Sequence, residues 1–121
     1  MADVGTLATT AQVLLAIGED GSTEQVLETN TNIWILMAES EMEVIVGQKK
    51  GLVANFGSIT AANKQWLALI ASHRAAFFGI NHNQNSWSLA TTQSKLNVCD
   101  SIWLDGVKQL RDKDVIADLG L

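Results

Sequence analysis

The chain has 121 residues, a formal charge of −5 at pH 7 and a single cysteine. This length fits one domain with its own core, and the lone Cys99 excludes an internal disulfide and a cysteine-based zinc site. The longest apolar run, VLLAI at 13–17, is far shorter than the roughly 20 residues that span a bilayer. An acidic residue, Asp3, stands where a signal peptide would carry a basic one. We therefore expect a soluble protein with no membrane partner.

Charge is distributed unevenly along the chain. Residues 1–48 hold eight acidic side chains and no lysine or arginine, which gives −8, whereas residues 44–99 hold five basic side chains and no acid, which gives +5. The acidic and basic parts of such a chain can pair within one fold. They can also pair head-to-tail between identical subunits, when the acidic flank of one meets the basic flank of the next. A solvated acidic face is the equally weighted alternative.

In chain order, residues 1–21 come first and are predicted to form an extended N-terminal arm, because their apolar residues follow no long helical period. Thr9 and Thr10 can cap a short helix over 11–17, whereas a strand over 12–17 added to a neighbouring subunit is the alternative. The turn-forming sequence GEDG at 18–21 ends the arm.

A helical bundle is predicted over 22–112, and its first main helix over 30–47. A capping box at 22–25 offers an earlier start, and Gly47 ends the helix. Apolar residues share the side expected to face the core: Trp34, Ile35, Ala38, Met42, Ile45 and Val46. The opposite side is expected to carry the glutamates Glu39, Glu41 and Glu43.

A loop or short strand pair follows over 48–57, with Leu52, Val53 and Phe56 directed inward. The stretch 58–81 is predicted to be the central helix, with Ser58 or Thr60 as its cap, because it is apolar on nearly every side. Its large apolar residues recur at three- and four-residue steps: Trp66, Leu69, Ile70, Phe77 and Ile80.

The third main helix is predicted to open at Ser88, with Leu89 and a two-heptad seam on its apolar side. The seam consists of Leu96, Cys99, Trp103, Gly106 and Leu110. Gly106 is expected to let another helix approach closely. Residues 113–121 form a C-terminal tail that can add a last helical turn or two. The predicted fold is therefore all-α, a small bundle of three main helices with an extended N-terminal arm and a C-terminal tail.

The sequence offers few candidates for chemistry, and we expect no enzyme, cofactor or metal. His73 and His82 are nine residues apart, which is not the three- or four-residue spacing of a helical metal-ligand pair. Cys99 lies on the apolar seam, where cysteine is inert. Glu39 and Glu43 resemble a di-metal carboxylate site only weakly, because the accompanying Glu-x-x-His is missing.

Several residues are instead candidates for contacts between subunits. Glu39 and Glu43 form an acidic patch, and the adjacent Lys49 and Lys50 form a basic spot that can lie near a nucleic-acid phosphate. Trp87 stands in a polar loop, which makes it the best interface candidate of the four tryptophans. The remaining candidates are the apolar residues of the arm, Val4 and Leu7.

Three segments, taken in order, carry a resemblance to a known family. They are NTNIWILMAESEMEVIVG at 30–47, ITAANKQWLALIASHRAAFFGIN at 59–81 and SLATTQSKLNVCDSIWLDGVKQLRDKDV at 88–115. In pattern and length they resemble the head–tail connector, or adaptor, proteins of tailed bacteriophages over roughly residues 30–115.

This resemblance implies a structural virion protein, made in the host cytoplasm and located at the head–tail junction. The family forms a homo-oligomeric ring, commonly of twelve copies, beneath the capsid portal. Tail, stopper or nozzle proteins then attach, and DNA passes through the lumen without sequence recognition. The family has no catalytic residues, and its C-terminal segment docks on the portal. That segment maps here onto Val115, Ile116, Leu119 and Leu121.

The alternative function is a small helical DNA-packaging or regulatory protein, similar to a small terminase. Strong duplex binding with a steep salt dependence would favour that reading. The acidic N-terminal half and a pI near 4.8 argue against it.

Overall fold

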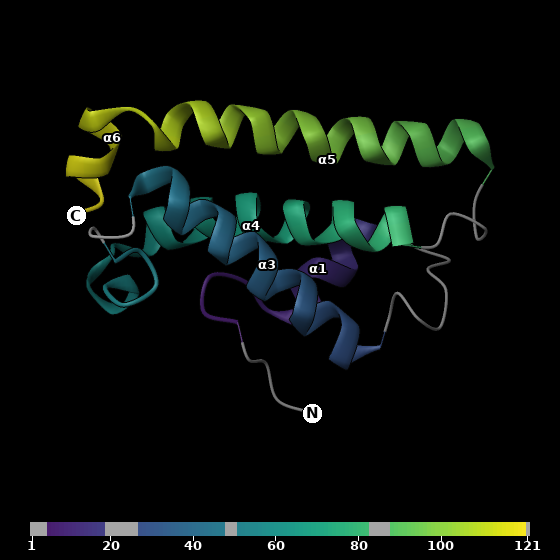
Figure 1. The fold of residues 1–121 in the computed structure, drawn as a ribbon, viewed down its shortest axis with the longest axis horizontal. Helices are drawn as coiled ribbons and strands as arrows, with labels where there is room; N and C mark the ends of the chain where they lie inside the picture. The colour runs from purple at the N-terminus through teal and green to yellow at the C-terminus, as the bar shows by residue number, and fades with distance from the viewer. Residues whose placement is uncertain (1–4, 19–26, 48–50, 83–87, 121) are drawn as a thin grey trace.

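The computed structural model describes residues 5–18, 27–47, 51–82 and 88–120, and these ranges are all-α, with no strand among them. The helices are α1 (Thr10–Ile17), α3 (Glu28–Val46), α4 (Ala61–His82), α5 (Leu89–Leu110) and α6 (Lys113–Asp118), with a 3-10 turn, η2 (Phe56–Ser58), before α4. α4 occupies the middle of the bundle, because it contacts α1, α3 and α5. α5 runs alongside it in the opposite direction (Figure 1). The predicted central position of 58–81 is confirmed.

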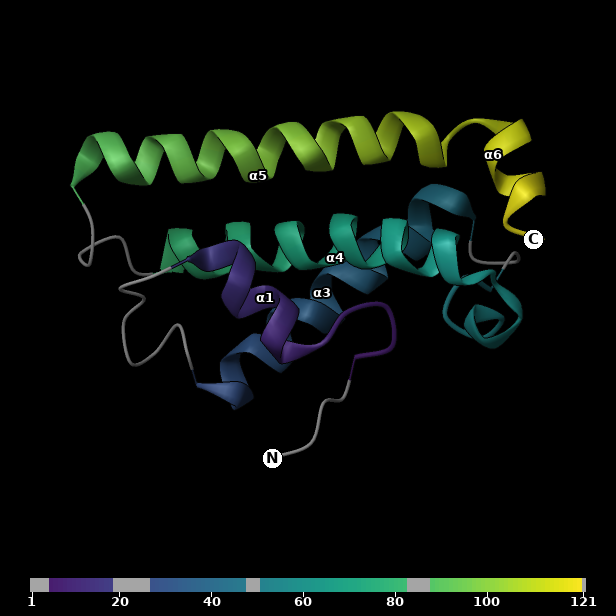
Figure 2. The same cartoon turned by 180° about the vertical axis from the view of Figure 1, so that it is seen from behind.

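α1 and α3 reach the central helix from different sides. α3 crosses in front of α4 in Figure 1, and α1 crosses in front of it when the molecule is turned around (Figure 2). The two helices also contact one another. The bundle described here therefore has four packed helices, whereas the sequence predicted three.

The N-terminal segment is the largest departure from the prediction. Residues 10–17 form a helix whose capping box joins Thr9 and Gln12 in both directions, at 3.2 Å and 2.8 Å. Val13 and Ile17 are buried in the core. The strand alternative for this segment is wrong. An extended arm over 1–21 is also wrong for its described part, 5–18, because these apolar side chains cover α4 instead of a neighbour.

Two polar contacts fix this segment on the bundle. The buried carboxylate of Glu39 in α3 accepts hydrogen bonds from the backbone N–H groups of Thr6 and Leu7. At the other end, Lys95 Nζ in α5 donates to the carbonyl oxygen of Ile17, at 2.6 Å. The second bond satisfies a carbonyl at the C-terminus of α1, where helices leave such groups unpaired.

The helix ends elsewhere follow local sequence signals. Gly47 ends α3 with a φ of 99°, a conformation that favours glycine. Thr60 Oγ1 accepts from the backbone N–H of Asn63 before α4, and Ser88 caps α5 by accepting from Thr91. Asp112 caps α6 through the backbone N–H of Asp114, at 2.8 Å. The predicted boundaries at Gly47, Thr60 and Ser88 are confirmed to within a few residues, whereas the cap at Asp112 was not predicted.

The contact between α4 and α5 follows the predicted seam. Cys99, Trp103, Gly106 and Leu110 are buried there. A Cβ atom at Gly106 would stand 2.8–2.9 Å from three side-chain carbons of Ile70, so only glycine permits this approach. Leu89, in contrast, is exposed, since the first turn of α5 extends beyond its neighbours.

Of the residues of the central helix that were predicted as core, Leu69 is exposed, and Trp66 and Phe77 are half-buried at the edge of the core. α4 directs Leu67, Ile70 and Ala71 inward instead. In the preceding loop Leu52 is fully buried, as predicted, and Phe56 packs at the edge of the core.

Candidate functional site

α3 carries an apolar surface that nothing in the described chain covers. We call it the outer stripe: Ile33, Leu36, Met37 and Val44, which are 50%, 44%, 45% and 64% exposed. Ser40, also exposed, lies between them. Residues 33, 37, 40 and 44 recur at helical three- and four-residue steps, so they share one face.

The outer stripe lies opposite the core face of the same helix. Ile35, Ala38 and Met42 are fully buried, and 100° per residue places Ile35 and Met42 about half a turn away from Met37 and Val44. α3 is therefore apolar on two opposite faces, which a single bundle does not require. Contiguous exposed apolar residues of this kind mark interaction surfaces more often than scattered ones do.

Acidic groups flank the outer stripe. Glu41 lies on one side and forms an ion pair with Arg74 of α4, with Nη2 and Oε2 3.1 Å apart. The guanidinium also lies 4.8 Å from the ring centre of Trp103, so Arg74 links α3, α4 and α5. Glu43 lies on the other side, where it accepts a 2.9 Å hydrogen bond from the backbone N–H of Val53. Both carboxylates are half-exposed and add negative charge beside the stripe.

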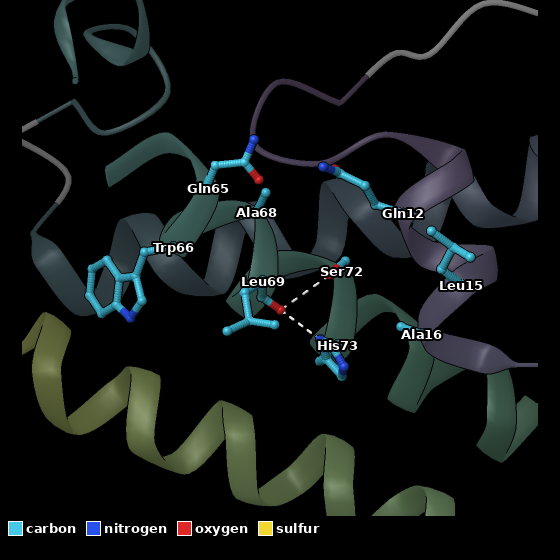
Figure 3. Close-up of a pocket in the computed structure, with 9 residues that line it drawn as sticks. All are labelled: Gln12, Leu15, Ala16, Gln65, Trp66, Ala68, Leu69, Ser72 and His73. Atoms are coloured by element: carbon cyan, nitrogen blue, oxygen red, sulfur yellow. Dashed lines mark hydrogen bonds between the residues drawn. The ribbon is translucent and has the colours of Figure 1, made fainter. Parts of the chain in front are cut away.

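A second apolar surface lies between α1 and α4, and we call it the α1–α4 groove. It has a volume of about 510 Å³ and is lined by Gln12, Leu15, Ala16, Gln65, Trp66, Ala68, Leu69, Ser72 and His73. Figure 3 shows Leu15 on one wall and Trp66 with Leu69 on the other. Leu15 is 84% exposed and Leu69 is 45% exposed, so the rim of the groove is apolar.

Ser72 and His73, two polar residues of the α1–α4 groove, contact the backbone of their own helix. The carbonyl oxygen of Leu69 accepts from Ser72 Oγ at 3.2 Å and lies 2.9 Å from His73 Nδ1 (Figure 3). Lys64 lies beside the groove, in a smaller adjoining depression that shares Gln12 and Gln65 with it. The nine lining residues include no acid, and the ammonium of Lys64 adds positive charge beside the groove.

The predicted subunit contacts need correction in two places. Leu7 is buried in the core of its own chain, and Glu39 is buried with its carboxylate bound to the N-terminal backbone. Neither side chain is available to a neighbour. Glu43 is half-exposed and remains a candidate. The other predicted interface residues, which are Val4, Lys49, Lys50 and Trp87, lie outside the described residues.

The predicted portal-docking residues fall in or beside α6. Val115 and Ile116 are half-buried, whereas Leu119 is buried against the bundle. The side chain of Leu119 therefore stabilises its own chain, and its prediction as a portal-docking residue is corrected. Leu121 lies outside the described part.

The histidines and the cysteine are placed as packing groups. His73 contacts its own helix, and His82 lies against Trp34 with ring centres 5.7 Å apart. Cys99 is buried, and burial raises the pKa of its thiol to about 11, although nearby Lys95 opposes the shift. A thiol with so high a pKa is a poor nucleophile.

Among the described residues, no cluster of three or more His, Cys, Asp or Glu side chains is placed to hold a metal ion. No described helix is both long and apolar enough to cross a membrane. No protein-family model, curated protein or solved structure matches the chain. The outer stripe and the α1–α4 groove, which sequence reasoning missed, are therefore the features on which a function can be argued.

Proposed function

We propose that this chain is a structural virion protein whose copies form a ring that adapts the capsid portal to the tail, with DNA passing through the lumen. The resemblance of residues 30–115 to phage head–tail adaptors suggests it. The observation that carries it is the outer stripe, because an apolar helix face directed to solvent calls for a partner. In this proposal α3, α4 and α5 are the bundle of the adaptor, and α1 and α6 are its docked ends.

A ring subunit needs two unlike surfaces, since each copy contacts its neighbours through different faces. The outer stripe on α3 and the α1–α4 groove meet that need. They involve different helices, and α1 and α3 lie toward the viewer in opposite views (Figures 1 and 2).

Portal attachment is assigned to the C-terminal end, with a narrower set of residues than the sequence suggested. Because Leu119 packs on its own bundle, the contact among the described residues is assigned to Val115 and Ile116. The replacement Ile116→Glu is expected to abolish binding to a purified portal ring while leaving the helical circular dichroism spectrum intact. Exposed Leu104→Glu on α5 is the matched control and is expected to bind normally.

The deciding experiment is the location of the chain in the particle. Cryo-electron microscopy of the assembled virion is expected to place it in a ring beneath the portal. A position elsewhere, or strong salt-dependent binding to duplex DNA by the isolated protein, would reject the adaptor function in favour of a packaging or regulatory one.

A further inference from the structure

We propose that the outer stripe of one copy docks in the α1–α4 groove of a second copy of this chain. This pairing deepens the proposed ring function, on which it rests, by naming the two surfaces that form the subunit contact. The contact is heterologous, because different residues are buried on the two partners.

The shapes of the two surfaces suit each other. Met37 and Val44 project from α3 on either side of the small Ser40, and an exposed helix with anchors at such spacing is a common ligand of apolar grooves. The groove has small lining residues, Ala68 and Ser72, between the larger walls. A ridge of apolar side chains thus meets a trough of similar chemistry.

Charge favours the same pairing. Glu43 flanks the outer stripe, and Lys64 stands beside the groove. α1 itself, TAQVLLAI, contains no charged residue. Placing the stripe in the groove therefore brings a negative rim toward a positive one, which steers association and sets its direction.

The competing symmetric arrangement pairs two stripes. It would bring the Glu43 flanks of two α3 helices together, and like charges across an interface oppose binding. It would also leave Leu15 and Leu69 of both copies exposed to water. The heterologous contact covers both surfaces in every copy except those at the open ends of an assembly, and closure into a ring removes the ends.

Two double variants separate these arrangements. Met37→Glu with Val44→Glu destroys the stripe, and Leu15→Glu with Leu69→Glu destroys the groove. All four residues are exposed, so both variants are expected to fold, as circular dichroism would verify. Leu104→Glu is the matched control on a surface outside both patches.

Molar mass is measured by light scattering over a series of concentrations for the full chain. The wild type and Leu104→Glu are expected to self-associate, and each double variant to remain monomeric, with association weakened at least about 100-fold. A mixture of the two double variants is expected to give a one-to-one dimer that does not grow, because each copy keeps one intact surface.

Other outcomes overturn the pairing. If the groove variant alone forms dimers, the stripes pair with each other, and if the stripe variant alone forms dimers, the grooves do. A wild type that stays monomeric at its highest soluble concentration also rejects it. If the dimer forms as expected but wild-type protein ignores the portal ring, the adaptor function fails while this contact stands. If both double variants associate as strongly as the wild type and the wild type binds the portal ring, this contact fails while the adaptor function stands.

Discussion

The contact between Gly106 and Ile70 offers the sharpest test of how closely α4 and α5 pack. A methyl group added by Gly106→Ala would stand 2.8–2.9 Å from both γ carbons and the δ carbon of Ile70. Ile70 is buried and branched at Cβ, so it has little freedom to move aside. Overpacking of this kind costs about 1–3 kcal/mol. Replacing glycine with alanine inside a helix stabilises the helix by about 1 kcal/mol, which offsets part of this cost. We therefore expect a net loss of roughly 0–2 kcal/mol in the free energy of unfolding.

The effect of Gly106→Ala on the free energy of unfolding should change sign when the Ile70 side chain is shortened. Ile70→Ala alone is expected to cost about 2–5 kcal/mol through lost burial and a cavity. In that background the new methyl enters empty space, so Gly106→Ala should stabilise the protein by about 1 kcal/mol. The coupling is measured by urea unfolding of the four proteins, followed by circular dichroism at one low concentration at which all are monomeric. Stabilisation by Gly106→Ala in the wild-type background would refute the close approach.

Three further outcomes follow from buried polar and charged groups. Glu39→Leu should lower the free energy of unfolding by about 2–3 kcal/mol and accelerate amide exchange at Leu7, because it leaves two backbone N–H groups unpaired. Slow exchange of the Leu7 amide in this variant would contradict the contact. Arg74→Lys should cost about 1 kcal/mol in urea unfolding, since an ammonium reproduces neither the two hydrogen bonds to Glu41 nor the contact of a planar guanidinium with the Trp103 ring. An unchanged midpoint would count against this role. The folded state raises the Cys99 pKa from 9.0 to about 11, so the stability that the neutral thiol contributes should be fully present below pH 9 and fall as the pH rises toward 11. The variant Cys99→Ala should not show this decline. An identical decline in that variant would show that the thiol is not its cause.

Features encoded by neighbouring residues could be predicted from the sequence. Gly47 and Gly106 act through backbone conformation or the lack of a side chain, and Ser88 acts through a side-chain hydrogen bond to the backbone three residues on, so their roles are visible in the local pattern. The buried face of α3 followed from its spacing for the same reason. Each of these signals depends on residues only a few positions apart.

Features that depend on distant partners could not be predicted. Glu39 looked like one of three surface glutamates, but the backbone that it binds lies 32 and 33 residues away. Trp66 and Leu69 looked like core because α4 has too few polar residues to reveal its open side. The outer stripe was hidden because the apolar residues of α3 form two faces, and periodicity analysis assigned them to one.

The order of the helices along the chain has a consequence for synthesis. α1 buries its apolar side against α4, whose last turns reach Ile80, about 60 residues after Ile17. At 5–20 residues per second, a ribosome needs roughly 3–12 s to make that stretch. During this interval Val13 and Ile17 of the nascent chain lack the surface of α4 that covers them in the folded bundle. α1 is thus made well before the helix on which it docks, and an early binding factor on the ribosome would find its apolar residues accessible.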